Sequence, residues 1–397
     1  MHARKIMLWL VALLFLIPSA ALAANVPGVT DTEIVIGISM PLSGPAALWG
    51  FTGLGAKAYA DYINEQGGIN GRKLKIIMKD DGYNPARAMA NFQEMKGQVF
   101  AVCALLGTAI CNATKDFFPE NKIPVVGVYG DARIYAQMPK DKLHYYFMTY
   151  PDYEDEAMYI TRYAAQKVGL KKLALFYQND DYGKMAKIGV EAAMTQLGGA
   201  AKLVDAVPFE VTDRALSTQA IKLKESGAEG VIIYSTPTHG ALIIKEMAKI
   251  GYTPKNFVTF TLADPIMYML TGPPWEGTYV SFPGSTGVPG SDPGADKVVA
   301  ILKKYNKDIE GKEFLSLFGA MSMIHLVQGL KNAGKDLTVE SLIKGMEQIK
   351  NWVPEGTGSA ISYSPTQHHG NNAARMGQAK GGKHAPTEDF TLFKPRF

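Results

Sequence analysis

The side chains best placed for chemistry stand directly after predicted strands. Residues 99–106 (VFAVCALL) have the apolar, β-branched pattern of a strand buried on both faces, and a helix is predicted at about 112–119. Between them, the Thr108 hydroxyl and the amide groups of Ala109 and Ile110 could bind a ligand carboxylate in the positive field of the helix start. Thr108 could equally be a plain helix cap, and the residues alone leave both interpretations open.

Other reactive side chains lack the spacing that catalysis or metal binding needs. Asp80 and Asp81 follow a predicted strand, and we expect them to cap the strand end before the next helix, not to form a paired-carboxylate catalyst. His368, His369 and His384 lie in a Gly- and Asn-rich tail without metal-ligand spacing, so we expect a solvated hairpin there. The sequence has no nucleophile elbow, phosphate loop, HExxH or CxxC motif. We therefore expect no enzymatic activity, no metal and no cofactor.

The two cysteines, Cys103 and Cys111, would enter an oxidising compartment if the chain is exported. Cys103 falls inside the predicted strand and Cys111 near the start of the following helix. This separation puts their Cα atoms beyond the roughly 7 Å that a disulfide tolerates, so we expect two free thiols, with a bridge as the alternative.

The amino terminus has the pattern of a Sec signal peptide. Arg4 and Lys5 precede an apolar run at 6–17, and residues 18–23 (PSAALA) end in an A-x-A cleavage site. The run is too short to span a bilayer stably, which argues against the alternative of a membrane anchor, and no cysteine follows the cleavage site to carry a lipid. We therefore expect residues 1–23 to be removed and the mature protein to lie in a bacterial periplasm.

Composition and charge are those of a globular protein without a polyanionic partner. The chain has 397 residues, of which 47% are hydrophobic and 20% charged, so two domains are expected. Its formal net charge of +4 falls by two when Arg4 and Lys5 leave with the signal peptide. So small a charge gives no reason to expect binding to nucleic acid or to an anionic membrane surface.

Alternating strand and helix patterns predict an α/β fold with doubly wound parallel sheets. A strand at 33–40, a helix at 52–66 and a strand at 74–78 form a unit that is right-handed and parallel almost without exception. Two further strands, the second at 123–128, complete a first lobe. Because ligands bind beyond the carboxyl ends of such strands, the loop LSGPAALWG at 42–50 is placed at the predicted site.

A second lobe of the same kind is predicted to begin near Thr149. The Pro- and Gly-rich interval 271–294 is predicted to be a linker, and short strand-like pieces after Ala360 predict a small antiparallel tail on the second lobe. The other predicted elements are helix 154–168, strand 172–177, helices 185–197 and 215–226, strand 230–234, helix 240–250, strand 256–260, and helices 297–305, 315–333 and 339–350.

Five features in order between Asp31 and Pro85 carry a family resemblance: a strand, PLSGP, the pair Trp49-Gly50, a helix ending in INEQGGINGRKL, and a strand entering DDGYNP. This combination resembles the type I periplasmic binding proteins of the branched-chain amino acid group, the soluble receptors of ABC importers. The resemblance implies two Rossmann-like lobes joined by a three-strand hinge, with crossings near 147–150, 279–284 and 352–358. The implied boundaries are 24–148 and 282–352 for lobe I, and 149–281 and 353–397 for lobe II.

The resemblance also implies a function. It implies a monomer that closes on a small carboxylate-bearing solute, either an amino acid or an organic or aromatic acid, and delivers it to ABC permease subunits of the inner membrane. A ligand-sensing module of a signalling system, built on the same fold, is the alternative.

Two positions depart from the family pattern. Asp131 stands where threonine is usual, and Thr261 stands where the family's acidic partner for the ligand ammonium is expected. Either Asp131 supplies that counter-charge from the opposite wall, or the ligand has no ammonium group. The ligand contacts implied by the resemblance are Trp49, Thr108, Ala109, Tyr129, Gly130, Asp131, Tyr182, Thr236 and Thr261.

Overall fold

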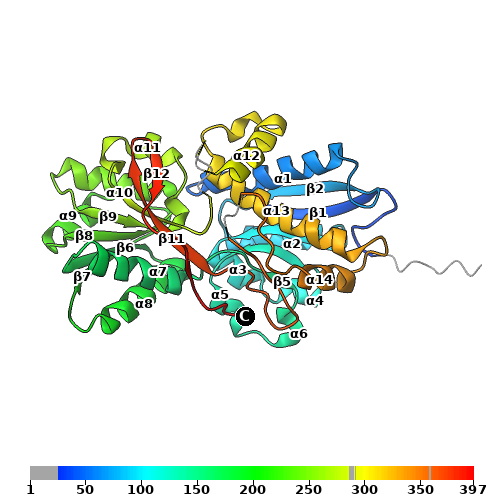
Figure 1. The fold of residues 1–397 in the computed structure, drawn as a ribbon, viewed down its shortest axis with the longest axis horizontal. Coiled ribbons are helices and arrows are strands. Elements are labelled where there is room, and N and C mark those ends of the chain that lie inside the picture. Colours follow the sequence, from blue (N-terminus) through cyan, green and yellow to red (C-terminus); the bar gives the residue numbers. More distant parts are fainter. Residues whose placement is uncertain (1–25, 286–289, 291, 357–358) are drawn as a thin grey trace, which may run out of the picture.

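The computed structural model describes residues 26–285, 290, 292–356 and 359–397, so the predicted signal peptide lies outside the described residues. The strands form two sheets, which belong to two lobes lying side by side along the longest axis of the molecule (Figure 1). We call the lobe around the amino-terminal sheet lobe I and the other one lobe II.

Lobe I is built on a parallel sheet with the strand order β2-β1-β3-β4-β5. Every residue of β3 and β4 is buried, which is the environment that their continuous apolar sequence predicts. The α2 helix starts at Pro85 because the Asn84 side chain accepts hydrogen bonds from the next free amides. The elements are β1 (Glu33–Met40), α1 (Gly50–Glu65), β2 (Lys73–Asp80), α2 (Pro85–Met95), β3 (Ala101–Leu106), α3 (Thr108–Thr114), α4 (Phe117–Glu120), β4 (Val125–Tyr129), α5 (Ala132–Ala136), α6 (Lys140–Leu143) and β5 (Tyr146–Phe147).

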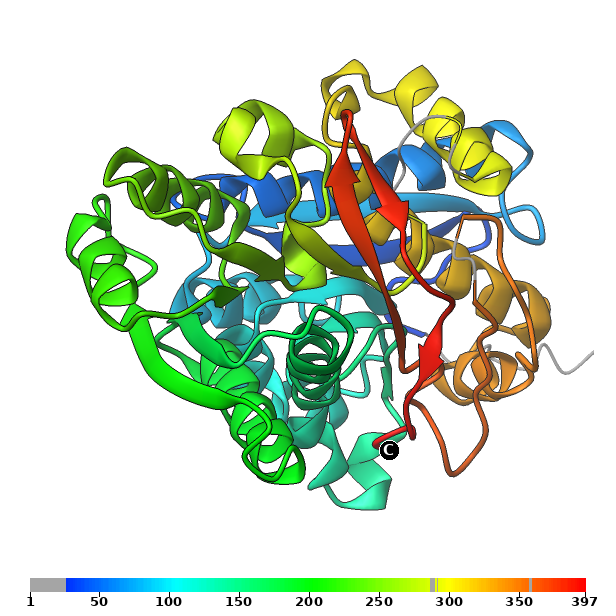
Figure 2. The same ribbon diagram turned by 60° about the vertical axis from the view of Figure 1, so that its left-hand side comes forward.

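Lobe II repeats this arrangement, with parallel strands in the order β7-β6-β8-β9-β10. β11 and β12 then add to the edge strand β10 in antiparallel pairing, which confirms the antiparallel tail, and their hairpin runs along one side of the lobe (Figure 2). The elements are α7 (Tyr153–Arg162), β6 (Lys172–Gln178), α8 (Asp181–Gln196), β7 (Lys202–Phe209), α9 (Ser217–Glu225), β8 (Gly230–Tyr234), α10 (Pro237–Lys249), β9 (Lys255–Val258), α11 (Ile266–Thr271), β10 (Tyr279–Phe282), β11 (Ala373–Lys380), β12 (Lys383–Pro386) and β13 (Thr391–Leu392).

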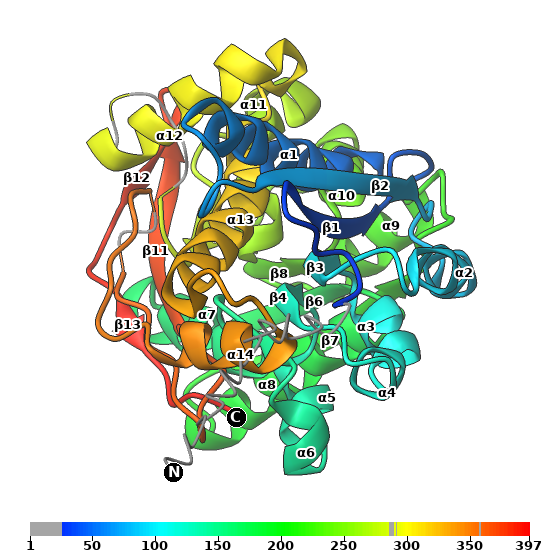
Figure 3. The same cartoon turned by 90° about the vertical axis from the view of Figure 1, so that its right-hand side faces the viewer.

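Three helices that follow β10 return to lobe I. They are α12 (Pro293–Tyr305), α13 (Glu313–Ala333) and α14 (Val339–Glu347), and α12 and α13 pack beside α1 (Figure 3). Among the described helices, α13 alone is long and apolar enough to cross a membrane, yet 94% of its apolar window is buried inside the protein. We therefore regard α13 as a core helix of lobe I.

The chain passes between the lobes three times. The first crossing follows β5, and the second follows β10. After α14 the chain stays on lobe I, because Trp352 pairs with Ile361 and Met148 pairs with His369. The third crossing therefore lies just before β11, later in the chain than the expected interval 352–358.

Two predictions for lobe II are wrong. No strand is predicted between residues 197 and 215, yet β7 lies there as an edge strand, where half-exposed residues such as Asp205 and the proline Pro208 are tolerated. The interval 271–294 is not simply a linker, because it contains the strand β10. Its Pro and Gly residues flank that strand without interrupting it.

The expected solvated hairpin around the tail histidines is also wrong, because all three imidazoles are buried. The His369 Nε2–H donates to Tyr150 O at 2.8 Å, and burial lowers the pKa of His369 to about 4. His384 accepts a hydrogen bond from Trp275 Nε1, and His368 stacks on an aromatic ring. Within the described ranges, no group of His, Cys, Asp and Glu could hold a metal ion, and both cysteines are free and buried.

Candidate functional site

In each sheet the strand order changes direction at one point, and these two switch points locate the candidate site. The switch point lies between β1 and β3 in lobe I and between β6 and β8 in lobe II. Open α/β sheets bind ligands beyond the carboxyl ends of the strands at such switch points. A cavity of about 30 Å³, which we call the cleft cavity, lies where loops from both switch points meet.

The cleft cavity has an aromatic and neutral lining. Six of its lining residues are aromatic and four carry aliphatic hydroxyl groups. None is charged, because burial raises the pKa of each lining tyrosine above its usual value. The lining residues are Trp49, Tyr83, Leu106, Gly107, Thr108 and Tyr129 from lobe I, and Tyr153, Tyr182, Ser235, Thr236, Phe260 and Thr261 from lobe II.

Thr108 is carried into the cavity by a turn that only glycine allows. Gly107 has a φ of +103°, and a Cβ there would lie 2.9 Å from the Tyr83 ring. Thr108 follows at the first position of α3 and is 1% exposed, and its Oγ1 has no hydrogen-bond partner. Among the described residues that line this cavity, Thr108 is the only one with a buried side-chain polar atom that has no hydrogen-bond partner. The Thr108 hydroxyl is therefore free to bind a ligand.

Tyr83 reaches the cavity from a strained backbone position, since its φ is +62°. The Asp81 carboxylate holds it there by accepting hydrogen bonds from Tyr83 N at 2.8 Å and Ser39 Oγ at 2.9 Å. Burial raises the pKa of Asp81 to about 6. Asp81 thus positions an aromatic wall of the site.

Asp80 caps the end of its strand as expected, and it also fixes a loop of the site. Its carboxylate accepts hydrogen bonds from Gly82 N at 2.9 Å, in the turn after β2, and from Leu42 N at 2.9 Å and Ser43 Oγ at 2.6 Å, which ties down the loop that leads to Trp49. Burial acts to raise its pKa, but these hydrogen bonds and the Arg87 guanidinium hold the pKa of Asp80 at about 2. The helix α2 itself is capped by Asn84.

On lobe II, three hydroxyl groups of the lining use their protons in hydrogen bonds within the lobe. The Thr261 hydroxyl donates to Ser235 O at 2.8 Å and therefore accepts from the Tyr182 hydroxyl at 2.9 Å. His239 Nε2–H donates to Asp213 O, so its Nδ1 accepts from the Thr236 hydroxyl at 2.7 Å. This wall offers a ligand lone pairs and aromatic faces but no positive charge.

A buried carboxylate outside the cavity supports this wall. Glu156, on α7, is fully buried and accepts hydrogen bonds from Phe260 N at 2.9 Å, Thr259 Oγ1 at 2.7 Å and Tyr234 Oη at 2.8 Å. Burial raises the pKa of Glu156 despite these donors. It holds the turn that presents Phe260 and Thr261 to the cavity.

Six of the nine residues implied by the resemblance line the cleft cavity, whereas Ala109, Gly130 and Asp131 do not. Gly130 packs on α3, since a Cβ there would lie 2.6 Å from Cys111 Sγ. The Asp131 side chain caps α5 by accepting a hydrogen bond from Arg133 N at 3.0 Å. Burial raises the pKa of Asp131.

The remaining lining residues were not predicted from the sequence, although part of the signal was available. Tyr83 belongs to the DDGYNP turn after a predicted strand, and Ser235 directly follows another, so the strand-end rule could have found both. Phe260 ends the predicted strand 256–260 and carries the same signal, whereas Tyr153 carries none. Tyr153 and Phe260 stack at a centroid distance of 6.0 Å because α7 and the turn after β9 meet in space.

The two lobes touch around the cavity. Arg133 Nη1 of lobe I lies 3.2 Å from Glu154 of lobe II, and the Asp264 carboxylate of lobe II accepts a hydrogen bond from Leu315 N of α13 at 2.9 Å. The Phe260 ring of lobe II stacks on Phe318 of α13 at 5.6 Å. The cleft cavity thus lies between lobes that are in contact.

Comparison with known proteins identifies a family. A family model described as periplasmic binding protein matches residues 33–383. The Leu/Ile/Val-binding protein homolog 1 of Brucella suis is 24% identical over 327 residues, which cover 81% of this chain and 85% of that protein. An amino acid binding protein of Pseudomonas aeruginosa is 27% identical over 231 residues, which cover 56% of this chain and 59% of that protein.

Solved structures share the fold. The branched-chain amino acid ABC transporter protein from Thermus thermophilus, with bound valine, has a TM-score of 0.82 at 18% identity and covers 92% of this chain and 98% of its own. The fatty acid ABC transporter substrate-binding protein from Thermomonospora curvata has a TM-score of 0.80 at 21% identity, with 93% and 94% covered. These likenesses confirm the two-lobed α/β architecture.

Proposed function

The chain belongs to the periplasmic binding protein family, in its branched-chain amino acid group, and from this premise we propose that it is the receptor of an ABC importer for a small carboxylic acid without an amino group. Its ligand binds in the cleft cavity between the lobes, and hinge motion about the three crossings closes the lobes over it. The body of the ligand is aromatic or aliphatic.

One observation carries the choice of ligand, namely the neutral lining of the cleft cavity. A buried ammonium group without a carboxylate partner would cost several kcal/mol, on the order of what an unpaired buried charge costs elsewhere. A carboxylate has a partner in the unoccupied Thr108 hydroxyl and in the amide groups of the first turn of α3, which have no partner within the helix. Six aromatic side chains suit an apolar ligand body.

The related proteins include both ligand chemistries. The Thermus thermophilus protein holds valine, which carries an ammonium group, and the Thermomonospora curvata protein is named for fatty acids, which carry none. Fold alone therefore does not decide between them. The threonine at position 261, hydrogen-bonded to Tyr182 and to Ser235 O, supports the amine-free choice for this chain.

The same proposal covers location and partners. We infer a monomer in the periplasm that delivers its ligand to permease subunits, with lobe I formed by residues 24–148 and by residues from 282 to about 370, beyond the expected end at 352. Packing of α12 and α13 on α1 supports this division. Residues 361 and 369 pair with lobe I, so we place the lobe II part of the tail from about residue 371 onward.

Calorimetric titration with 3-phenylpropionate and phenylalanine, which differ by the amino group, tests the proposal. We expect tight binding of 3-phenylpropionate and at least tenfold weaker binding of phenylalanine. Thr108→Ala removes a hydrogen bond to a charged group, typically about 1.5–3 kcal/mol, so the affinity for 3-phenylpropionate should fall about tenfold or more.

Two control variants make this test specific. Thr108→Ser keeps the hydroxyl and should bind nearly as well as the wild type. Thr114→Ala removes another buried hydroxyl of α3, which donates to Ile110 O and does not line the cavity, so it should leave binding unchanged. Tighter binding of phenylalanine than of 3-phenylpropionate would overturn the proposal.

A further inference from the structure

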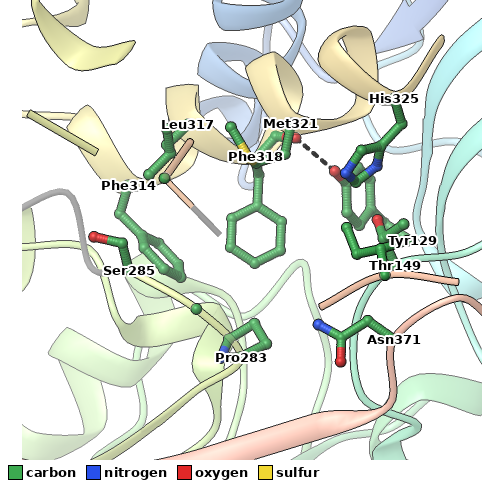
Figure 4. A pocket seen from close by; sticks show the side chains of 13 residues that line it. Tyr129, Thr149, Pro283, Ser285, Phe314, Leu317, Phe318, Met321, His325 and Asn371 are labelled. Atoms are coloured by element: carbon green, nitrogen blue, oxygen red, sulfur yellow. Dashed lines mark hydrogen bonds between the residues drawn. The ribbon is translucent and has the colours of Figure 1, made fainter. Parts of the chain in front are cut away.

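A second cavity, of about 50 Å³, lies at the hinge, and we call it the hinge cavity. Thr149, Pro283 and Asn371, which line it, come from the three crossings between the lobes. Half of its other lining residues lie on α13 (Figure 4). The hinge cavity is thus in contact with every segment that moves when the lobes close.

The α13 face along this cavity is long. Phe314, Phe318, Met321 and His325 follow one another at spacings of four, three and four residues, which places them on one side of a helix. At 1.5 Å per residue, this face extends for roughly 16 Å. Figure 4 shows the rings of Phe314, Phe318 and His325 pointing from α13 to the same side. The lining therefore suits an elongated molecule better than a compact one.

The hinge cavity and the cleft cavity share a wall made of two rings. Tyr129 lines both cavities, and its hydroxyl is fixed by a hydrogen bond to Phe318 O at 2.6 Å. The Phe318 ring lines the hinge cavity and packs against Phe260 and Trp49 of the cleft cavity at 5.6 and 6.3 Å. The Phe318 ring is held by packing against aromatic rings and not by a hydrogen bond, so the two spaces join only where a ligand displaces this ring.

Each cavity also contains one buried polar side chain without a partner. In the cleft cavity it is Thr108, and in the hinge cavity it is His325, which is 1% exposed and has no partner at either ring nitrogen. Burial lowers the pKa of His325 to about 3, so the imidazole is neutral at pH 7. An unpartnered buried imidazole is costly, and a neutral hydrogen-bonding group on a ligand would remove that cost.

We propose that the two cavities form one site for an elongated carboxylic acid, with its carboxylate at Thr108 and a hydroxyl or similar neutral polar group at His325. The apolar stem of the ligand passes the rings of Tyr129 and Phe318. His325 lies seven residues beyond Phe318 on α13, so the polar end reaches roughly 10 Å past the shared wall. This inference rests on the proposed function and adds the length and the second polar group of the ligand.

The test compares three acids. 3-Phenylpropionate is the short acid of the proposed function, whereas 10-hydroxydecanoate and undecanoate are longer, have equal length and differ in the terminal hydroxyl. In calorimetric titration of the wild type, we expect 10-hydroxydecanoate to bind at least tenfold more tightly than undecanoate. His325→Leu should abolish that difference, because it removes the polar partner and keeps the apolar volume.

Further variants separate binding from folding. Met321→Phe fills the hinge cavity and should weaken both long acids at least tenfold, whereas Phe318→Leu opens the shared wall and should strengthen them. Met323→Leu, a buried position of α13 outside both linings, is the matched control and should change nothing. Melting temperatures identify any variant that fails to fold, and the opposite effects expected at 318 and 321 keep the test decisive.

The outcomes distinguish the two proposals. One outcome is that 3-phenylpropionate binds and the long acids bind no more tightly than it does. Another is that neither Met321→Phe nor His325→Leu changes the affinity for the long acids. In either case the elongated site is wrong and the proposed function stands. If none of the three acids binds, both proposals fail.

Discussion

The Asp131 carboxylate is buried, yet it is directed to the start of α5 and is not part of the cleft cavity lining. The protein supplies its donor and its nearest cation, because Arg133 N lies 3.0 Å away and Arg133 Nε lies 3.9 Å away. A carboxylate with these partners does not need a ligand ammonium group. The structure therefore favours a capping role for Asp131.

Asp131→Asn tests this role. Because asparagine caps a helix about as well as aspartate, the affinity for 3-phenylpropionate should change by less than about threefold. Phenylalanine should remain a weak ligand of both the wild type and the variant. Calorimetric titration of the wild type and the variant with both ligands makes the measurement. A loss of affinity for phenylalanine alone would show that Asp131 is the counter-charge of a ligand ammonium group.

The pairing of α1 with α13 is the contact that joins the two parts of lobe I. The helices meet backbone to backbone, since a Cβ on Gly319 would lie 1.6 Å from Thr52 O and one on Gly55 would lie 1.9 Å from Ser316 O. Phe318 is next to Gly319, so the same contact sets the position of the wall between the two cavities. Helices at this distance cannot separate slightly without loss of packing on both sides.

Gly319→Ala should therefore be strongly destabilising. Overpacking of a close-packed contact typically costs about 1–3 kcal/mol, and a clash with backbone atoms belongs at the upper end of that range or above it. Urea denaturation of the variant and of Lys331→Ala, an exposed change on the same helix, measures the difference. A loss of stability at Gly319→Ala no larger than that at Lys331→Ala would contradict the backbone contact.

A buried carboxylate also links the two lobes of the whole molecule. Asp264, which precedes α11, is fully buried and accepts hydrogen bonds from Ile266 N at 2.8 Å and from Leu315 N of α13 at 2.9 Å. Burial raises the pKa of Asp264 from 3.8 to about 7, and the nearby Glu313 carboxylate acts in the same direction. The folded protein therefore binds a proton at Asp264 that the unfolded chain releases near pH 4.

This pKa shift gives the stability a defined pH dependence. Because the folded-state pKa is the higher one, the contribution of Asp264 to stability is largest below about pH 4 and is lost as the pH rises to about 7. Asp264→Asn cannot ionise, so the unfolding free energy of the wild type relative to this variant should fall over that range, by at most about 4 kcal/mol. Denaturation of both proteins at four pH values measures the difference, and a difference independent of pH would show that the pKa is not raised.

The sequence alone determined most elements of both lobes and the loops in which to look for a site. Residues such as those of β3 and β8 form uninterrupted apolar runs, and a run of this kind has one stable environment, the interior of a parallel sheet. Once the strands are known, their carboxyl ends are known, and Thr108 follows directly, whereas Tyr182 and Thr236 are implied by the family resemblance. The edge strand β7 was not predicted, because half of its environment is solvent and its apolar pattern is correspondingly weak.

Only the tertiary structure decided which polar groups are free. Thr108 and Asp131 stand at equivalent strand ends, yet one hydroxyl is left without a partner and the other side chain caps a helix. His325 and Phe318 come to the site from a helix far along the chain, and the tail histidines are buried against rings that no local pattern associates with them. Strand patterns are local because they depend on the burial of neighbouring residues, whereas hydrogen-bond partners and cavity walls are supplied by whatever the fold brings into contact.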